Sequence, residues 1–284
     1  MNAGFGAWLF GMSLGAGAPG GMLGIAGGMF VVLAATTFVA GLLYAVSGFG
    51  FAVVAAPLFL LFLDPGRAIQ LVIIISTALS IAVVRALLPA IAPWLLLRLA
   101  LGSLVGLPLG LVAFRHADPI LVRAAAGATI FGFAVLMAVS RRWSGQPDQD
   151  KHWTAFAMSP GLDLAAGAVS GIAAALVGTP GPPVLIYLLL AGAEARTVRA
   201  TLLAFFALSY GVTLVSHAAT IGIPAPTWLA AAILIPFGFF GGLAGRPIGD
   251  RLGAEGFAML AIALLAVAGA YWLVRSWASV ETRA

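Results

Sequence analysis

The chain has 284 residues, of which 62% are hydrophobic and only 8% are charged, with a formal net charge of +5 and a mean hydropathy of +1.12. A soluble domain carries about 25% charged residues, so this composition excludes a water-soluble globule, and the positive charge is expected to orient the chain in a membrane rather than to bind nucleic acid. The absence of cysteine excludes disulfides, thiolate metal sites and cysteine nucleophiles.

Long apolar stretches predict an all-α polytopic membrane protein, because about 20 apolar residues span a bilayer. We expect a Gly-rich apolar segment over 1–28, membrane repeat 1 over 29–140, a polar linker over 141–156, membrane repeat 2 over 157–276 and a C-terminal tail over 277–284. The spans expected in repeat 1 cover 29–47, 50–63, 67–88, 93–114 and 119–140. Those expected in repeat 2 cover 161–178, 181–193, 197–221, 226–246 and 253–274.

The two groups of spans share features in the same order. Each first span ends in a Gly-rich break, SGFG from Ser47 or VGTPG from Val177, and each break precedes a short segment. Each fourth span has spaced glycines, which allow helices to approach closely. These glycines are Gly102, Gly106 and Gly110 in the first group, and Gly238, Gly242 and Gly245 in the second.

An odd number of crossings per group turns the second group upside down relative to the first, which is the inverted repeat common in secondary transporters. Re-entrant short segments, the alternative to spanning ones, would change this assignment. The loops on the side of the linker carry more Lys and Arg than those on the other side, which favours a cytoplasmic linker with both termini outside.

The breaks are interpreted as a binding site. Non-helical backbone at membrane depth is tolerated only inside protein or beside a watery cavity, and the helix that follows a break offers an N-terminus suited to an anion. The residues expected to bind substrate here are Ser47, Gly48, Phe49, Gly50, Gly178, Thr179, Pro180 and Gly181. Packing kinks are the alternative, since Gly and Pro are common in membrane helices.

Polar side chains within the spans are candidates to complete the site. Gln70, Thr77 and Ser209 are expected to add hydrogen bonds to the substrate, although Ser and Thr also bond back to their own helix. His217 and Asp163 are candidates for proton coupling. A packed histidine and a helix-start aspartate are the alternatives to that role.

The breaks, the short segments with an internal proline (Pro57, Pro183), the D-P-x-x-A motif from Asp64 and the later glycine-spaced helix resemble the sulfite exporter TauE/SafE family of membrane transporters. The resemblance covers roughly residues 30 to 274. Glu194 to Ala200 lacks the D-P pair, and VGTPGPP contains more proline than is expected of the family. The resemblance implies a bacterial inner membrane and a substrate such as sulfite, a sulfonate or a related organic anion.

The expected function is therefore secondary transport of a small anion by alternating access, with an anion or small-solute channel as the alternative. An enzyme is not expected, because the spans hold no H-E-x-x-H motif and few acids. No cofactor or metal is expected, and the only lysine, Lys151, is in no P-loop. The lipid bilayer and the anion are the expected partners, and assembly into a homo-oligomer is left open.

Overall fold

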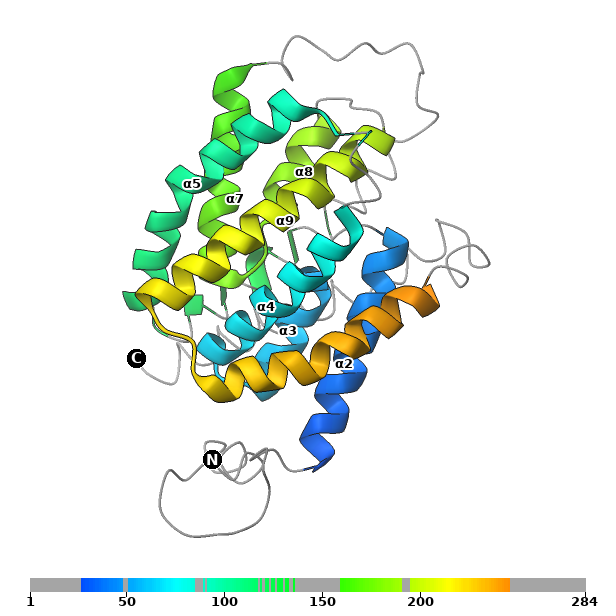
Figure 1. The fold of residues 1–284 in the computed structure, drawn as a ribbon. Coiled ribbons are helices and arrows are strands. Elements are labelled where there is room, and N and C mark those ends of the chain that lie inside the picture. Colours follow the sequence, from blue (N-terminus) through cyan, green and yellow to red (C-terminus); the bar gives the residue numbers. More distant parts are fainter. Residues whose placement is uncertain are drawn as a thin grey trace.

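The computed structural model describes residues 27–47, 51–84, 91–116, 159–190 and 195–245, with isolated positions between 89 and 135. Regular structure in these residues is helical (Figure 1). The labelled helices are α2 (Gly27–Ser47), α3 (Phe51–Phe62), α4 (Pro65–Val84), α5 (Pro93–His116), α7 (Pro160–Val177), α8 (Gly181–Leu190) and α9 (Ala195–Thr220). A further helix, Ala225–Gly245, follows α9 and is orange in Figure 1.

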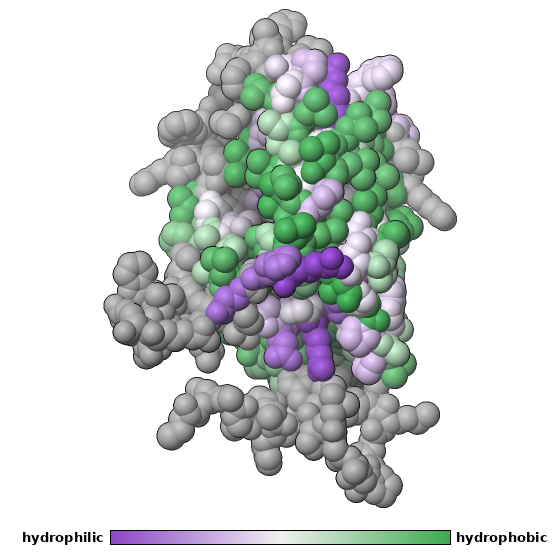
Figure 2. Space-filling model, turned by 90° about the vertical axis from the view of Figure 1, so that its left-hand side faces the viewer, coloured by the Kyte–Doolittle hydropathy of each residue, from purple (hydrophilic) through white to green (hydrophobic). Residues whose placement is uncertain are grey.

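Five helices of the described residues are long and apolar enough to cross a membrane. They are α4, α5, α7, the Ala200–Thr220 part of α9, and Ala225–Gly245, while α3 and Met29–Tyr44 of α2 are shorter apolar helices. Leu101, Val105, Leu109 and Val112 of α5 are exposed. The side of the molecule on which α5 lies in Figure 1 has a broad apolar surface with hydrophilic residues above and below it (Figure 2). The prediction of a polytopic helical membrane protein is confirmed.

Helices α5 and α7 pack closely through glycine. A Cβ added to Gly102, Gly106 or Gly110 would overlap the backbone of Leu164, Ala168 or Ile172 respectively. The reverse contacts place Gly167 and Gly171 of α7 against Leu99 and Ser103 of α5. The residue numbers rise together on both helices, so α5 and α7 run in the same direction.

Helix α2 packs in the same manner against Ala225–Gly245. A Cβ on Gly241 would overlap the carbonyl oxygen of Phe38, and one on Gly245 would be 2.5 Å from the carbonyl oxygen of Leu42. Gly41 is equally close to the backbone of Gly238. These two helices are also parallel. Their contact uses Gly241, one position before the expected Gly242.

Hydrogen bonds define the direction of the central helices. At the end of α9, the carbonyl oxygen of Gly222 accepts a bond from Gln70 Nε2, near the start of α4, at 2.9 Å, so α4 and α9 are antiparallel. Helices α5 and α9 are parallel, because Ala92 N–H donates to Thr201 Oγ1 at 3.3 Å and Arg115 donates to the carbonyl oxygen of Thr220. Helices α5, α7 and α9 thus begin at one membrane face, face 1, and α2, α4 and Ala225–Gly245 begin at the other, face 2.

Helix α8 folds back along α7. Ser170 of α7 donates a hydrogen bond to the carbonyl oxygen of Pro180, and Tyr187 of α8 donates one to Asp163, near the start of α7. Ser170 lies ten residues from the start of α7, or about 15 Å at 1.5 Å per residue. Half of a hydrocarbon core is also about 15 Å, so α8 begins near the middle of the membrane and returns toward face 1.

Candidate functional site

The second break, Val177 to Gly181, ends α7 through a left-handed residue. Gly178 has φ of +72°, a conformation that costs a residue with a Cβ about 1–2 kcal/mol. Its N–H donates to the carbonyl oxygen of Ala174 at 3.0 Å, and the N–H of Thr179 donates to that of Ala173 at 3.4 Å. The glycine therefore stops α7 and satisfies two terminal carbonyl groups before the chain turns into α8.

The start of α8 contains two prolines, Pro182 and Pro183, within its first turn, as expected from their fixed φ. Because Pro180, Pro182 and Pro183 have no N–H, this terminus has fewer backbone donors than an ordinary helix start. Gly181 can still offer its N–H. A polar side chain at this position consequently matters more than it would elsewhere.

Thr179 is that side chain. It is buried, and its Oγ1 has no hydrogen-bond partner among the described residues. A buried hydroxyl without a partner costs about 1–3 kcal/mol, and such groups are rare unless a function or a ligand explains them. Thr179 and the start of α8 form the core of the candidate site.

Helix α9 brings further polar atoms toward the end of α7. His217 is fully buried, and its Nε2 lies 3.1 Å from the carbonyl oxygen of Ala175. Since a carbonyl only accepts, Nε2 carries the proton and Nδ1 is left as an acceptor. His217 Nδ1 and Oγ1 of the buried Thr213 lack hydrogen-bond partners in the described part of the chain. Ser209 Oγ is 3.5 Å from Ser103 Oγ of α5.

Helix α4 packs against the break, but its two candidate residues have other bonds. An added Cβ on Gly178 would lie 3.5 Å from Ile69 Cγ2 and 3.6 Å from Val72 Cγ1. Gln70, between them in sequence, donates to Gly222 as described above. Thr77 donates to the carbonyl oxygen of Ile73 at 2.7 Å, within its own helix, which is the back-bonding that sequence alone left open.

The first break lies largely outside the described residues. Helix α2 ends at Ser47 and α3 begins at Phe51. Gly48, Phe49, Gly50 and the side chain of Ser47 are among the positions that the structure does not describe. Their expected contribution to the site stays a prediction.

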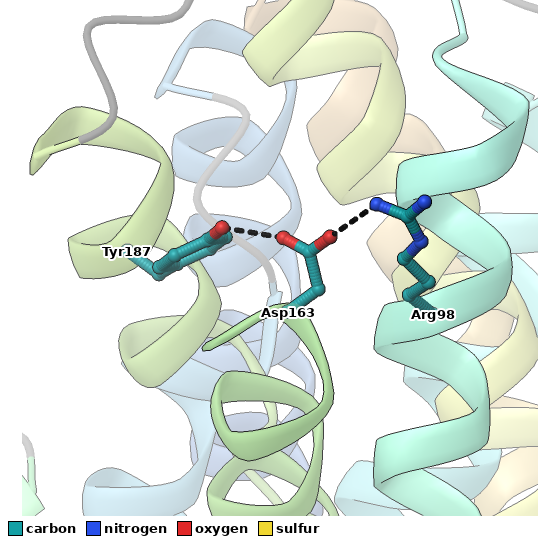
Figure 3. A network of polar contacts seen from close by, with 3 residues as sticks. All are labelled: Arg98, Asp163 and Tyr187. Atoms are coloured by element: carbon teal, nitrogen blue, oxygen red, sulfur yellow. Dashed lines mark hydrogen bonds and ion pairs between the residues drawn. The ribbon is translucent and has the colours of Figure 1, made fainter. Parts of the chain in front are cut away.

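A second polar cluster lies near face 1 (Figure 3). Asp163 is only 1% exposed. Its Oδ2 lies 3.2 Å from Nη1 of Arg98 on α5, and its Oδ1 accepts the hydrogen bond from Tyr187. Figure 3 shows the phenol and the guanidinium approaching the carboxylate from opposite sides. Arg98 is 36% exposed, so the ion pair lies at the edge of the protein.

A comparison with protein families matches residues 33–272 to the family described as sulfite exporter TauE/SafE. The chain belongs to the TauE/SafE family. Neither curated proteins nor solved structures gave a match. TauE/SafE proteins are membrane transporters, so the chain is a transporter and not an enzyme.

Sequence reasoning had not joined three residues of this TauE/SafE chain. Tyr187 and Arg98 are not among the residues that the sequence predicts for a site, and Asp163 is predicted there without either partner. The glycine spacing of α5 is the signal that could have paired them, since a close contact of α5 with α7 brings Arg98 toward Asp163. Thr213 shares a helix face with His217, and this spacing of four was visible in the sequence.

Proposed function

We propose that this TauE/SafE protein is a secondary transporter that moves a small anion, such as sulfite or a sulfonate, by alternating access around its two helix breaks. The observation that carries the proposal is the buried Thr179 hydroxyl without a partner, beside a helix start near the middle of the membrane. Family membership supports the anionic substrate. The cytoplasmic linker and the bacterial inner membrane belong to the same proposal.

The chemistry of the break suits a single small anion. The start of α8 carries the partial positive charge of a helix N-terminus, and a sulfonyl oxygen could accept from Gly181 N–H and Thr179 Oγ1. In a membrane interior these donors face little competition from water, so each bond to a charged oxygen stabilises the complex more than the same bond at a surface. Pyramidal sulfite and a tetrahedral sulfonate group each have three oxygens, which are enough acceptors for both donors.

An inverted repeat over 29–140 and 157–276 is the architecture that we propose for this movement. The two glycine contacts support it through their registers. Gly106 meets Ala168 and Gly110 meets Ile172, while Gly241 meets Phe38 and Gly245 meets Leu42. On all four helices the contacting residues are four apart. Residues of α2 correspond to those 130 positions later on α7, and residues of α5 correspond to those 135 positions later on Ala225–Gly245.

Helix direction supports the same repeat. The helices α2, α4 and Ala225–Gly245 begin at face 2, and α7, α9 and α5, their proposed counterparts, begin at face 1. By this relation the first break, Ser47 to Gly50, is the counterpart of Val177 to Pro180 and approaches the substrate from the other side. We propose that Gln70, Thr77 and Ser209 add hydrogen bonds to the substrate around the two breaks.

His217 is the stronger of the two candidates for proton coupling. Its Nδ1 is an acceptor without a partner in the described residues, whereas the Asp163 carboxylate already accepts from Arg98 and Tyr187. Both carboxylate oxygens of Asp163 are therefore engaged in contacts between helices. Asp163 is accordingly the less suited carrier.

The test is counterflow in proteoliposomes preloaded with unlabelled sulfite or a two-carbon sulfonate, with labelled anion outside. We expect transient accumulation by the wild-type protein and none by Gly178→Leu, because leucine strains the left-handed backbone and meets Ile69 and Val72. Gly211→Leu is the matched control, since an added Cβ there finds no atom within 4 Å. Flux that rises linearly with concentration, without counterflow, would favour the channel, and folded protein without flux of any tested anion would contradict the substrate.

A further inference from the structure

The Arg98–Asp163–Tyr187 cluster joins three helices near face 1. Asp163 lies in the first turn of α7, Arg98 lies six residues into α5, and Tyr187 lies on α8. Helices α5 and α7 are already held together by their interlocked glycines. Helix α8 has no such glycine contact in the described residues, and the Tyr187 hydroxyl provides a polar attachment to the α5–α7 pair.

Helix α8 also carries the candidate site at its other end. Tyr187 is six residues beyond Gly181, the first residue of α8, which is about 9 Å along a helix. A movement of α8 away from α7 at Tyr187 would therefore open the space between face 1 and the break. The break itself, with Gly178 and Thr179, is the segment that can absorb such a rotation, because it is not helical.

Arg98 strengthens this attachment without touching α8. Its guanidinium fixes the position of the Asp163 carboxylate through the ion pair at 3.2 Å, and a phenol donates a stronger hydrogen bond to a carboxylate than to a neutral group. The cluster thus has a fixed part, Arg98 with Asp163, and a part that can be released, the hydroxyl of Tyr187.

Among the described residues, the proposed repeat gives this cluster no counterpart at face 2. The glycine registers relate Asp163 to Leu33 of α2 and Arg98 to Ile233 of the helix Ala225–Gly245. Both counterparts are apolar and form no ion pair. In the part of the chain that the structure describes, the two faces therefore differ in their polar contacts.

We infer that Tyr187 is a latch that holds α8 against Asp163 and closes the path from face 1 to the break, with Arg98 as the positioning residue that sets its strength. This inference rests on the proposed function. Release of Tyr187 opens face 1, and the absence of a matching latch at face 2 makes the two access states unequal in free energy.

The experiment measures access to the break from each side. The chain has no cysteine, so Thr179→Cys provides a single reporter, labelled by a membrane-impermeant thiol reagent in vesicles of both orientations. With Tyr187→Phe added, we expect labelling from face 1 to rise roughly tenfold, as loss of a hydrogen bond to a charged group predicts, and labelling from face 2 to fall. Asp163→Asn should shift both rates in the same directions by a smaller factor.

Tyr210→Phe is the matched control, since it removes a buried hydroxyl from α9, away from the cluster. It should leave both labelling rates unchanged. Equal labelling of Tyr187→Phe and its parent from face 1, or an equal rise from both faces as general loosening would give, overturns the latch. If labelling rises from face 1 and falls from face 2 but no anion shows counterflow, the latch is retained and the anionic substrate is rejected. If counterflow is seen but labelling does not change between the faces, the substrate is retained and the latch is rejected.

Discussion

Two glycines of the described residues, Gly178 and Gly222, share a left-handed backbone, with φ of +72° and +83°. Their surroundings differ. Gly178 is buried against α4, whereas Gly222 lies in the exposed turn after α9 with nothing within 4 Å of an added Cβ. The pair therefore separates the cost of the backbone conformation from the cost of disturbing the break.

Alanine at each position should cost about 1–2 kcal/mol of stability, because the strain in the backbone is the same. Gly178→Ala should also lower counterflow at least tenfold, since alanine favours continuing α7 and shifts the start of α8. Gly222→Ala should keep its transport rate. Thermal unfolding in detergent and counterflow of the same preparations measure the two effects, and an equal loss of transport in both variants would contradict a special role for the break.

Thr179 can be tested by a change that keeps its shape. Thr179→Val removes a buried hydroxyl without a partner, so the protein without substrate should become more stable by about 1 kcal/mol. The substrate concentration for half-maximal transport should rise roughly tenfold, because a bond to an anion is lost. Thr37→Val is the control, since that hydroxyl bonds to Leu33 in its own helix. Unchanged half-saturation in Thr179→Val would remove the hydroxyl from the site.

At the scale of helices, the contacts between glycine faces are the most sensitive to volume. Gly106→Ala should sharply lower the yield and thermal stability of folded protein, because its Cβ would overlap the carbonyl oxygen of Ala168 and neither backbone can yield cheaply. Gly241→Ala should behave alike against Phe38. Gly211→Ala, which has open space, should be neutral or stabilising by up to about 1 kcal/mol. Retention of stability by Gly106→Ala would show that the helices can separate.

The helices themselves were largely predictable from sequence. The expected segments 50–63 and 93–114 correspond to α3 and α5 within two residues, because hydropathy, proline and glycine are local signals. The pairing of faces was not predictable in the same way. Gly241 and Gly242 are both possible partners of α2 by spacing alone, and only the packed register selects Gly241. The bond of Gln70 to Gly222 joins residues 152 apart and likewise depends on how α4 meets α9.

At the scale of the molecule, helix direction can be checked with single cysteines. Gly66→Cys at the start of α4 and Pro224→Cys after α9 should be labelled from the same side of the membrane, because Gln70 and Gly222 are hydrogen-bonded. Trp94→Cys at the start of α5 should be labelled from the opposite side, since Ala92 bonds to Thr201 near the start of α9. Labelling of all three from one side would contradict the assignment of faces 1 and 2.

The contact of α2 with Ala225–Gly245 also determines when the protein can be completed during synthesis. Gly41 meets Gly238, 197 residues later in the chain. At a synthesis rate of 5–20 residues per second, these residues take roughly 10–40 s to make. During this time the glycine surface of α2 lacks the helix against which it packs. Neither half can therefore mature on the ribosome alone, and two separately expressed halves should be stable only when they are made together.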